Sequence, residues 1–232
     1  MTQTSVTAPV RKWQLLSGSS LKMIAMITML IDHIGALLLY ASPYYQTFRN
    51  IGRISFPLFC FLLVQGFKHT RHMKRYFLSL AVFAIISEIP FDLAFSQTMF
   101  DWEYQNIFFT LLIGLAVIWA MNRYCRIPVL QFVFPAAGMV LAYLLKTDYS
   151  YIGVLLISVL YFFSNARIVQ AFTGAICMLQ TPYALYAFIP ALMYNGKRGW
   201  ITGRFKYLFY LFYPVHLLVL IAIRFFLFPN GQ

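Results

Sequence analysis

The sequence predicts an all-α integral membrane protein, and three observations support this prediction. The chain has 232 residues, of which 61% are hydrophobic and only 10% are charged. A soluble domain carries roughly 25% charged residues, so this chain lacks the surface that keeps a domain dissolved. The mean hydropathy of +0.73 and the repeated long apolar stretches favour a polytopic helical bundle. Composition therefore excludes a water-soluble enzyme, a disulfide scaffold and a disordered chain.

Apolar stretches follow one another along nearly the whole chain. They cover about residues 23–40, 54–67, 76–95, 107–121, 127–145, 151–163, 168–179, 182–194 and 207–228. We therefore expect about nine transmembrane helices, within a range of about eight to ten. Several stretches are shorter than the roughly 20 residues that a helix needs to cross the hydrocarbon layer. Those helices must be extended by polar ends, thin the bilayer or re-enter the side from which they came.

Basic residues are distributed unequally between the loops. Assigning the loops to alternating sides puts 14 of the 18 Lys and Arg residues on one side. The four others are Arg49, Arg53, Lys146 and Arg224. The positive-inside rule then predicts a cytoplasmic N-terminus and, for nine spans, an outer C-terminus. A net charge of +12 would suggest nucleic acid for a soluble chain, but here topology explains it, and we expect no nucleic-acid partner.

The chain is expected to form one transmembrane domain over residues 21–232, preceded by a polar cytoplasmic tail over residues 1–20. The tail lacks the apolar core and cleavage site of a signal peptide. Short linkers and the absence of internal repeats favour a single compact bundle. The three cysteines are isolated in apolar sequence, so we interpret them as packing residues and expect no metal site. The oligomeric state stays open.

A few ionisable side chains lie inside the apolar stretches, where a charge is costly and usually faces a partner or a water-filled cavity. Counting about 1.5 Å per helical residue from the nearest basic loop places His33 about 16 Å deep and His216 about 15 Å deep. Two histidines from opposite ends of the chain are thus expected at the same level. The same count places four more polar residues in the middle and outer half, namely Glu88, Arg53, Asp92 and Asn106.

These residues allow a structural and a functional interpretation. Glu88 and Asp92 are four residues apart and share a helix face, although Pro90 between them is expected to kink the span. Arg53 is at the right level to neutralise either carboxylate, as a purely structural ion pair or within a site. Asp32 and His33 are adjacent and point about 100° apart, so Asp32 is expected to bond a neighbouring helix instead.

Two basic elements lie on the predicted cytoplasmic side. Residues 68–75 include Arg71, Lys74 and Arg75, and the second loop contains Lys197 and Arg198. Their ordinary meaning is a topology signal and contact with anionic lipid head groups. Such a cluster would also bind the phosphates of a nucleotide-like cofactor. Neither element is a Walker-type loop or a dinucleotide fingerprint.

Several short strings, taken in this order and spacing, resemble the TraX family, bacterial proteins named for F-pilin acetylation. The strings lie at residues 21–35, 52–59, 87–92, 105–110, 194–199 and 212–217. The resemblance covers almost the whole chain. The family is in turn similar to acyltransferase-3-type membrane enzymes and to the lysosomal heparan-sulfate N-acetyltransferase. Those relatives carry an acetyl group from cytoplasmic acetyl-CoA to an acceptor across the membrane.

The resemblance implies roles for residues that match the family position by position. It makes His33 the histidine of the first span, Arg53 the arginine of the second, Arg71 and Arg75 the basic pair that follows, and His216 the histidine of the last span. It also implies acetyl-CoA as co-substrate and a location in the bacterial inner membrane. The constellation coincides with the residues that depth counting selects.

Chemistry then suggests how these groups act together. An amine or hydroxyl that attacks a thioester must lose a proton, and a histidine is suited to accept it, so His33 is the expected general base. The expected catalytic set is His33, Asp32, Arg53, Glu88, Asp92 and His216. The expected substrate-binding donors are Asn106 and Thr110. The expected cofactor-phosphate ligands are Arg71, Lys74, Arg75, Lys197 and Arg198. Direct transfer and an acyl-histidine intermediate both stay open.

The sequence thus predicts a transmembrane N- or O-acetyltransferase whose acceptor is reached from the outer side. A pilin-like peptide, a cell-envelope sugar and a small molecule are all compatible acceptors, and membrane lipid is the other expected partner. The alternative is a proton-coupled transporter or flippase, because Asp, Glu and His chains inside membranes also mark proton relays. A transporter often shows inverted repeats, which this chain lacks. A third possibility is a non-catalytic assembly or scaffold protein.

Overall fold

The protein folds into a bundle of helices in a computed structural model that describes residues 12–201 and 206–228. Within these ranges the regular elements are helical, accompanied by two isolated bridges. In chain order they are α1 (Gly18–Leu38), α2 (Tyr45–Gly52), α3 (Ser55–His69), α4 (Met73–Phe95), α5 (Ile107–Arg123), α6 (Leu130–Leu144), α7 (Ser150–Phe162), α8 (Arg167–Cys177), the 3-10 helix η1 (Pro182–Ala187), α9 (Phe188–Leu192) and α10 (Lys206–Leu227). The all-α fold class is therefore confirmed.

Each predicted apolar stretch coincides with a helix, and the short α2 is the additional one. In the described part of the chain, four segments are long and apolar enough to cross a membrane: Gly18–Leu38, Tyr45–His69, Met73–Phe95 and Tyr207–Leu227. The expected count of about nine spans stays a prediction. The 11 residues of α8 extend only about 16 Å, about half of the hydrocarbon thickness, so this helix alone cannot span.

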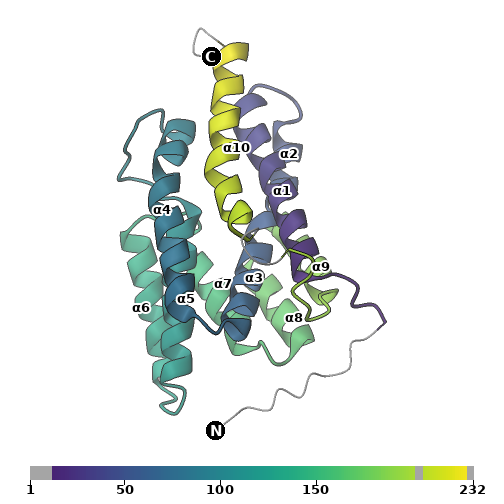
Figure 1. Ribbon diagram of the computed structural model, residues 1–232, viewed down its shortest axis with the longest axis vertical. Coiled ribbons are helices and arrows are strands. Elements are labelled where there is room, and N and C mark those ends of the chain that lie inside the picture. Colours follow the sequence, from purple (N-terminus) through teal and green to yellow (C-terminus); the bar gives the residue numbers. More distant parts are fainter. Residues whose placement is uncertain (1–11, 202–205, 229–232) are drawn as a thin grey trace.

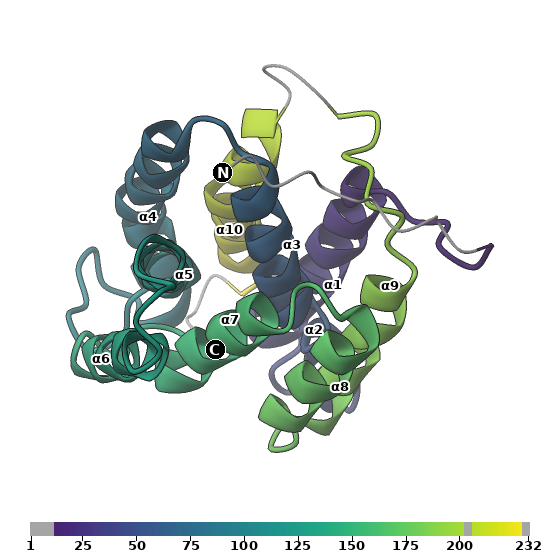
Figure 2. The same cartoon turned by 90° about the horizontal axis from the view of Figure 1, so that it is seen from below.

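Helices α1, α4 and α10 run in the same direction, and α10 packs against both α1 and α4 (Figure 1). Helices α5, α6 and α7 pack against one another, and α5 also packs against α4. The turns after α3, α5 and α7 and the segment 195–201 lie at the lower end of Figure 1, which we call the basic end because it carries Lys68, Arg71, Lys74, Arg75, Arg123, Arg126, Arg167, Lys197 and Arg198. Figure 2 views the bundle from this end and shows α8 and α9 packed beside α3 and α7. The basic loops therefore lie at one end of the bundle, as expected from alternating the loops. That this end faces the cytoplasm stays a prediction.

The start of α1 is held by the segment that precedes α10. The backbone N–H of Gly18 donates to the carbonyl of Lys197 at 2.8 Å, and the N–H of Asn195 donates to the carbonyl of Leu16 at 2.8 Å. Ser17 caps the helix by accepting from the N–H of Ser20 at 3.2 Å. This pairing fixes the start of α1 at Gly18 rather than at residue 21 and holds residues 195–198 beside it.

The hairpin of α1 and α2 is packed through two glycines. A Cβ atom on Gly52 would lie 2.2 Å from the Cβ of Asp32, and one on Gly35 would lie 2.7 Å from the Cβ of Phe48. Side chains at these positions would separate the two helices. The glycines therefore permit the close approach that places Asp32 against α2.

Gly52→Ala is expected to destabilise the protein by about 1–3 kcal/mol, because the added methyl group overlaps the first side-chain carbon of Asp32. Thermal unfolding in detergent measures the loss. Gly196→Ala is the control, since a Cβ there would lie more than 4 Å from all described atoms. Its φ of 78° means that this variant tests only the cost of a left-handed backbone conformation, about 1 kcal/mol. Equal melting temperatures for Gly52→Ala and the wild type would contradict this packing.

Candidate functional site

Two histidines from opposite ends of the chain meet inside the bundle. His33 of α1 and His216 of α10 are 8% and 5% exposed. The Nδ1 atom of His33 lies 2.6 Å from the Nε2 atom of His216. Their rings are stacked with an interplanar angle of 5° and centroids 4.9 Å apart. The equal depth expected from the sequence therefore corresponds to a direct contact between the two side chains.

The hydrogen bonds of the pair fix which ring nitrogens carry protons. The Nδ1 atom of His216 lies 2.7 Å from the carbonyl oxygen of Phe212, which can only accept, so this nitrogen carries hydrogen. In the neutral ring, Nε2 of His216 is then an acceptor, and Nδ1–H of His33 must be the donor. Neutral His33 consequently has its lone pair on Nε2. Hydrogen bonds thus connect the Phe212 carbonyl to His216 and His216 to His33. They orient His33 as a carboxylate orients the histidine of a catalytic carboxylate–histidine pair.

Aromatic rings enclose the histidine pair. The Phe95 ring of α4 meets His33 edge-on at a centroid distance of 5.6 Å. The Tyr213 ring meets His33 at 6.0 Å and His216 at 5.7 Å, also edge-on. Phe212 stacks on His216 at 4.7 Å. These rings restrict the imidazoles to few orientations and keep the space beside them small.

Asp32 points away from the histidine pair. Its carboxylate accepts a 2.6 Å charged hydrogen bond from Arg49 of α2. Its other oxygen is buried without a hydrogen-bond partner among the described residues. The sequence predicted a bond to a neighbouring helix, and Arg49 supplies it. Arg49 itself was considered only as a loop charge and not as a site residue.

The expected pairing of Arg53 with Glu88 or Asp92 is wrong. Arg53 lies between α2 and α3, and its guanidinium interacts with the side chain of Tyr149. Asp32 and Asp148 are the carboxylates that interact electrostatically with it. Residues at equal depth can face different neighbours around a helix, and depth counting carries no information on that direction.

Glu88 and Asp92 instead face the start of α5 and the loop before it. The side-chain amide of Asn106 donates to Glu88, and the N–H of Asp101 donates to Asp92 at 2.9 Å. Asp92 is 1% exposed, and each of the two carboxylates has one buried oxygen without a partner among the described residues. The helix continues through Pro90. The two acids therefore share one environment as expected, but no described ion pair neutralises them.

Asn106 and Thr110 are committed to the fold rather than free to bind a substrate. Both are fully buried. Asn106 caps α5 by accepting from the N–H of Phe108 at 3.0 Å and donates to the carbonyl of Ala84 at 2.8 Å. The Thr110 hydroxyl bonds Thr147 at 3.0 Å and the carbonyl of Asp148. These contacts hold α5 to α4 and to the turn before α7.

A polar cluster at the end opposite the basic end was not predicted from the sequence. The hydroxyl of Tyr104 donates to Asp148 at 2.5 Å, and the N–H of Tyr149 donates to the same carboxylate at 2.9 Å. Burial raises the pKa of Asp148, while the bond from Tyr104 and the charge of Arg53 lower it. In the sequence these residues are isolated loop positions, and no motif indicated that their side chains would meet.

The five expected phosphate ligands lie on the surface of the basic end. Arg71, Lys74 and Arg75 follow α3, and Lys197 and Arg198 precede α10. All five side chains are exposed. The structure therefore places both basic loops at the same end of the bundle, available to an anionic group.

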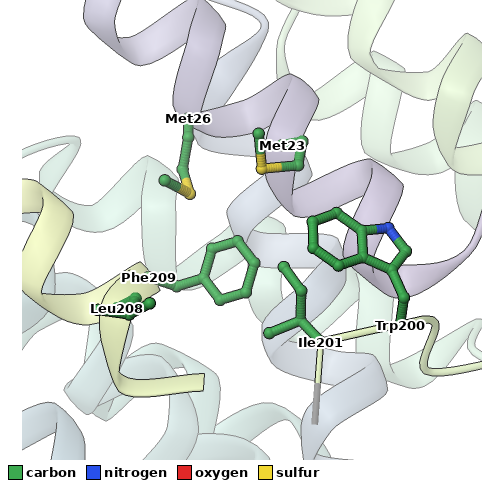
Figure 3. Close-up of a pocket in the computed structure, with 6 residues that line it drawn as sticks. All are labelled: Met23, Met26, Trp200, Ile201, Leu208 and Phe209. Atoms are coloured by element: carbon green, nitrogen blue, oxygen red, sulfur yellow. The ribbon is translucent and has the colours of Figure 1, made fainter. Parts of the chain in front are cut away.

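A cavity of about 450 Å³ opens between the first halves of α1 and α10 and the segment before α10. Figure 3 shows Met23 and Met26 of α1 facing Phe209 of α10, while Trp200 and Ile201 close one side; Leu208 completes the lining. The Lys22 ammonium lies 5.0 Å from the centre of the Phe209 ring. The cavity is therefore apolar inside, with a basic residue beside one of its lining rings.

The cavity and the histidine pair lie along the same helix seam. Met26 and Phe209 each precede a histidine of the pair by seven residues, which is two helical turns or about 10 Å. Positions seven apart lie on the same face of a helix. The cavity therefore lies about two helical turns from His33 and His216, on the basic side of the pair.

Comparison with known proteins adds what geometry alone does not give. The family model for the TraX protein matches residues 17–224. The chain belongs to the TraX family. This TraX-family match includes α1, the histidine pair and the helix α10 up to Arg224.

A curated relative of this TraX-family chain is the probable fimbrial assembly protein FimC, serogroup H1, of Dichelobacter nodosus. The two are 29% identical over 237 residues, which cover 91% of this chain and 97% of the relative. No solved structure matches the chain. The TraX assignment and the FimC likeness therefore rest on sequence over nearly the full length.

Proposed function

We propose that this protein is a transmembrane acetyltransferase that moves an acetyl group from acetyl-CoA at the basic end to an amine or hydroxyl acceptor at the opposite end. The observation that carries this proposal is the buried contact between His33 and His216. Acyl transfer from a thioester needs a base with an available lone pair in a partly dry site. The tautomers of the pair provide that lone pair at Nε2 of His33.

The proposed reaction is an acyl transfer, either directly to the acceptor or in two steps through an acyl-histidine intermediate. In the direct form, Nε2 of His33 takes the proton of the acceptor while the acceptor nitrogen or oxygen attacks the thioester carbon. The carbon–sulfur bond then breaks, and the thiolate takes the proton back from His33. His216 stabilises the transient imidazolium of His33 by accepting the Nδ1–H bond, and the Phe212 carbonyl holds His216.

The basic end and the apolar cavity would receive the donor. Arg71, Lys74, Arg75, Lys197 and Arg198 offer guanidinium and ammonium groups to phosphates, with bidentate contacts from the arginines. The apolar cavity, about two helical turns from the histidine pair, would receive the pantetheine arm. Acetyl-CoA supplies the activated acyl group, and the rings around His33 favour a small one.

Met26→Trp is expected to raise the KM for acetyl-CoA by about 10-fold or more, because the indole would fill the cavity on the path to His33. Steady-state acetyl transfer at varied acetyl-CoA concentration measures the effect. Ile27→Trp is the matched control, since Ile27 is the next residue of α1 and is 52% exposed. Equal KM values for the two variants would remove the cavity from the donor path.

The acceptor is proposed from the relatives rather than from a described contact. The curated relative is named as a probable fimbrial assembly protein, and the resemblance of the sequence to the TraX family implies pilin acetylation. A pilin-like peptide is therefore the first acceptor to test, followed by a cell-envelope sugar. Both would approach from the end opposite the basic end, in the inner membrane of a bacterium.

The direct experiment uses the purified full-length protein with acetyl-CoA labelled in the acetyl group. The proposal predicts that the protein releases CoA and transfers label to an amine-bearing peptide or an amino sugar. Absence of both CoA release and transfer with all acceptors would refute it.

A proton-coupled transporter is the second candidate, and one observation favours it. Glu88 and Asp92 are carboxylates in the bundle, each with one buried oxygen that has no partner among the described residues, as groups of a proton relay can have. Proton-dependent uptake into liposomes without acetyl-CoA would support the transporter. Acetyl transfer without such uptake would support the enzyme.

A further inference from the structure

We propose that Phe95 limits the length of the acyl group that His33 can transfer. The inference rests on the proposed acetyltransferase function and concerns which acyl donors the same site accepts. Phe95 is the last residue of α4, and its ring meets the His33 ring at 5.6 Å with an interplanar angle of 66°. No sequence motif pointed to this residue.

The direction of donor entry determines where a longer acyl chain would go. The proposed function brings the thioester to His33 from the basic end, the end at which the cavity lies. The acyl carbons beyond the carbonyl then continue toward the opposite end of the bundle. Helix α4 packs beside α10 and runs in the same direction (Figure 1). Its last residue, Phe95, places its ring against His33.

Phe95 differs from the other rings around His33 in its exposure. His216 and Tyr213 are 5% and 4% exposed, and both belong to α10. Phe95 is 37% exposed, so one side of its ring borders open space. Truncating this ring would therefore create space beside His33 at the edge of the bundle, whereas truncating a ring of α10 would open the core.

A second aromatic ring supports Phe95 from behind. Phe91, one helical turn earlier, is 4% exposed and contacts the Phe95 ring at a centroid distance of 5.0 Å. Tyr104 contacts Phe91 from the far side at 5.4 Å. The Phe95 ring therefore contacts both His33 and the buried Phe91, and these contacts restrict its movement.

The test compares acetyl-, propionyl- and butyryl-CoA as donors for the wild type, Phe95→Ala and Phe95→Leu. The wild type is expected to prefer acetyl-CoA over propionyl-CoA. One methylene in an apolar pocket changes kcat/KM by about 10- to 200-fold, so Phe95→Ala should raise the propionyl-to-acetyl ratio by about 10-fold or more. Phe95→Leu should give a smaller rise, and it keeps enough bulk to fold if the alanine variant does not.

Phe100→Ala is the matched control, because it removes the same ring from a loop position that is 66% exposed. Its donor ratio should equal that of the wild type. A wild-type ratio in both Phe95 variants, with acetyl transfer retained, would overturn the inference and leave the proposed function standing. A wild type that uses none of the three thioesters would refute the proposed function, and this inference with it.

Discussion

His33→Ala should lower acetyl transfer by about 10²- to 10⁴-fold, the range that one general base contributes. The loss follows from the hydrogen-bond order of the pair, which leaves the lone pair of the site on Nε2 of His33. No other described imidazole contacts this pair. The measurement is the rate of CoA release and acceptor acetylation by purified protein at saturating acetyl-CoA.

Thr28→Val is the control for His33→Ala. Thr28 is a buried polar residue of the same helix, and its hydroxyl donates to the carbonyl of Ile24 at 2.9 Å, within α1. This variant should retain wild-type activity. A His33→Ala protein that unfolds at the wild-type temperature and keeps full activity would remove His33 from the chemistry.

His216→Phe should lower the rate by about 10²- to 10⁴-fold as well, although His216 is not the expected base. The phenyl ring retains the stacking on His33 and Phe212 but offers no acceptor to Nδ1–H of His33. His33 can then adopt the other tautomer, and loss of tautomer control in a serine-protease triad costs about 10⁴-fold. Turnover at fixed pH, with thermal unfolding as the folding readout, measures this effect.

His216→Gln provides a graded comparison for the phenylalanine variant. Its side-chain oxygen can accept the bond from His33, so its loss of activity should be smaller. Equal losses in the two variants would show that the acceptor atom of His216 has no role. Variants with a lower melting temperature but wild-type turnover would show that His216 has only a structural role.

The sequence predicted the positions of the helices because burial in lipid appears directly as hydropathy. Each apolar stretch became a helix, including the three short ones between residues 150 and 194. Helix α2 was missed because Gln46, Arg49 and Asn50 interrupt any apolar pattern. Its position depends instead on Gly52, which lets α2 pack closely against Asp32.

The candidate site was predictable in depth but not in direction. A helix rises by a constant amount per residue, so counting from the basic loops placed His33 and His216 at one level. Direction around each helix depends on packing, and for this reason Arg53 was assigned to the wrong carboxylates. The role of Asn106 had a local signal, because an asparagine directly before an apolar stretch is a preferred helix cap.

Other contributors had no local signal at all. Phe95 and Tyr213 are ordinary aromatic residues of apolar stretches, and only the packing of α10 against α1 and of α4 against α10 brings them to His33. Asp148 and Tyr104 come from loops 44 residues apart in the chain. Contacts of this kind are set by tertiary structure, so a single sequence does not reveal them.

The most direct measurement is a double-mutant cycle on the two histidines, with kcat for acetyl transfer determined for His33→Ala, His216→Phe and the double variant. If the imidazoles act as one unit, the double variant should lose about as much activity as His33→Ala alone, because the second substitution then removes a partner of a base that is already absent. Losses that multiply in the double variant would show that the two histidines act independently, and they would contradict the account.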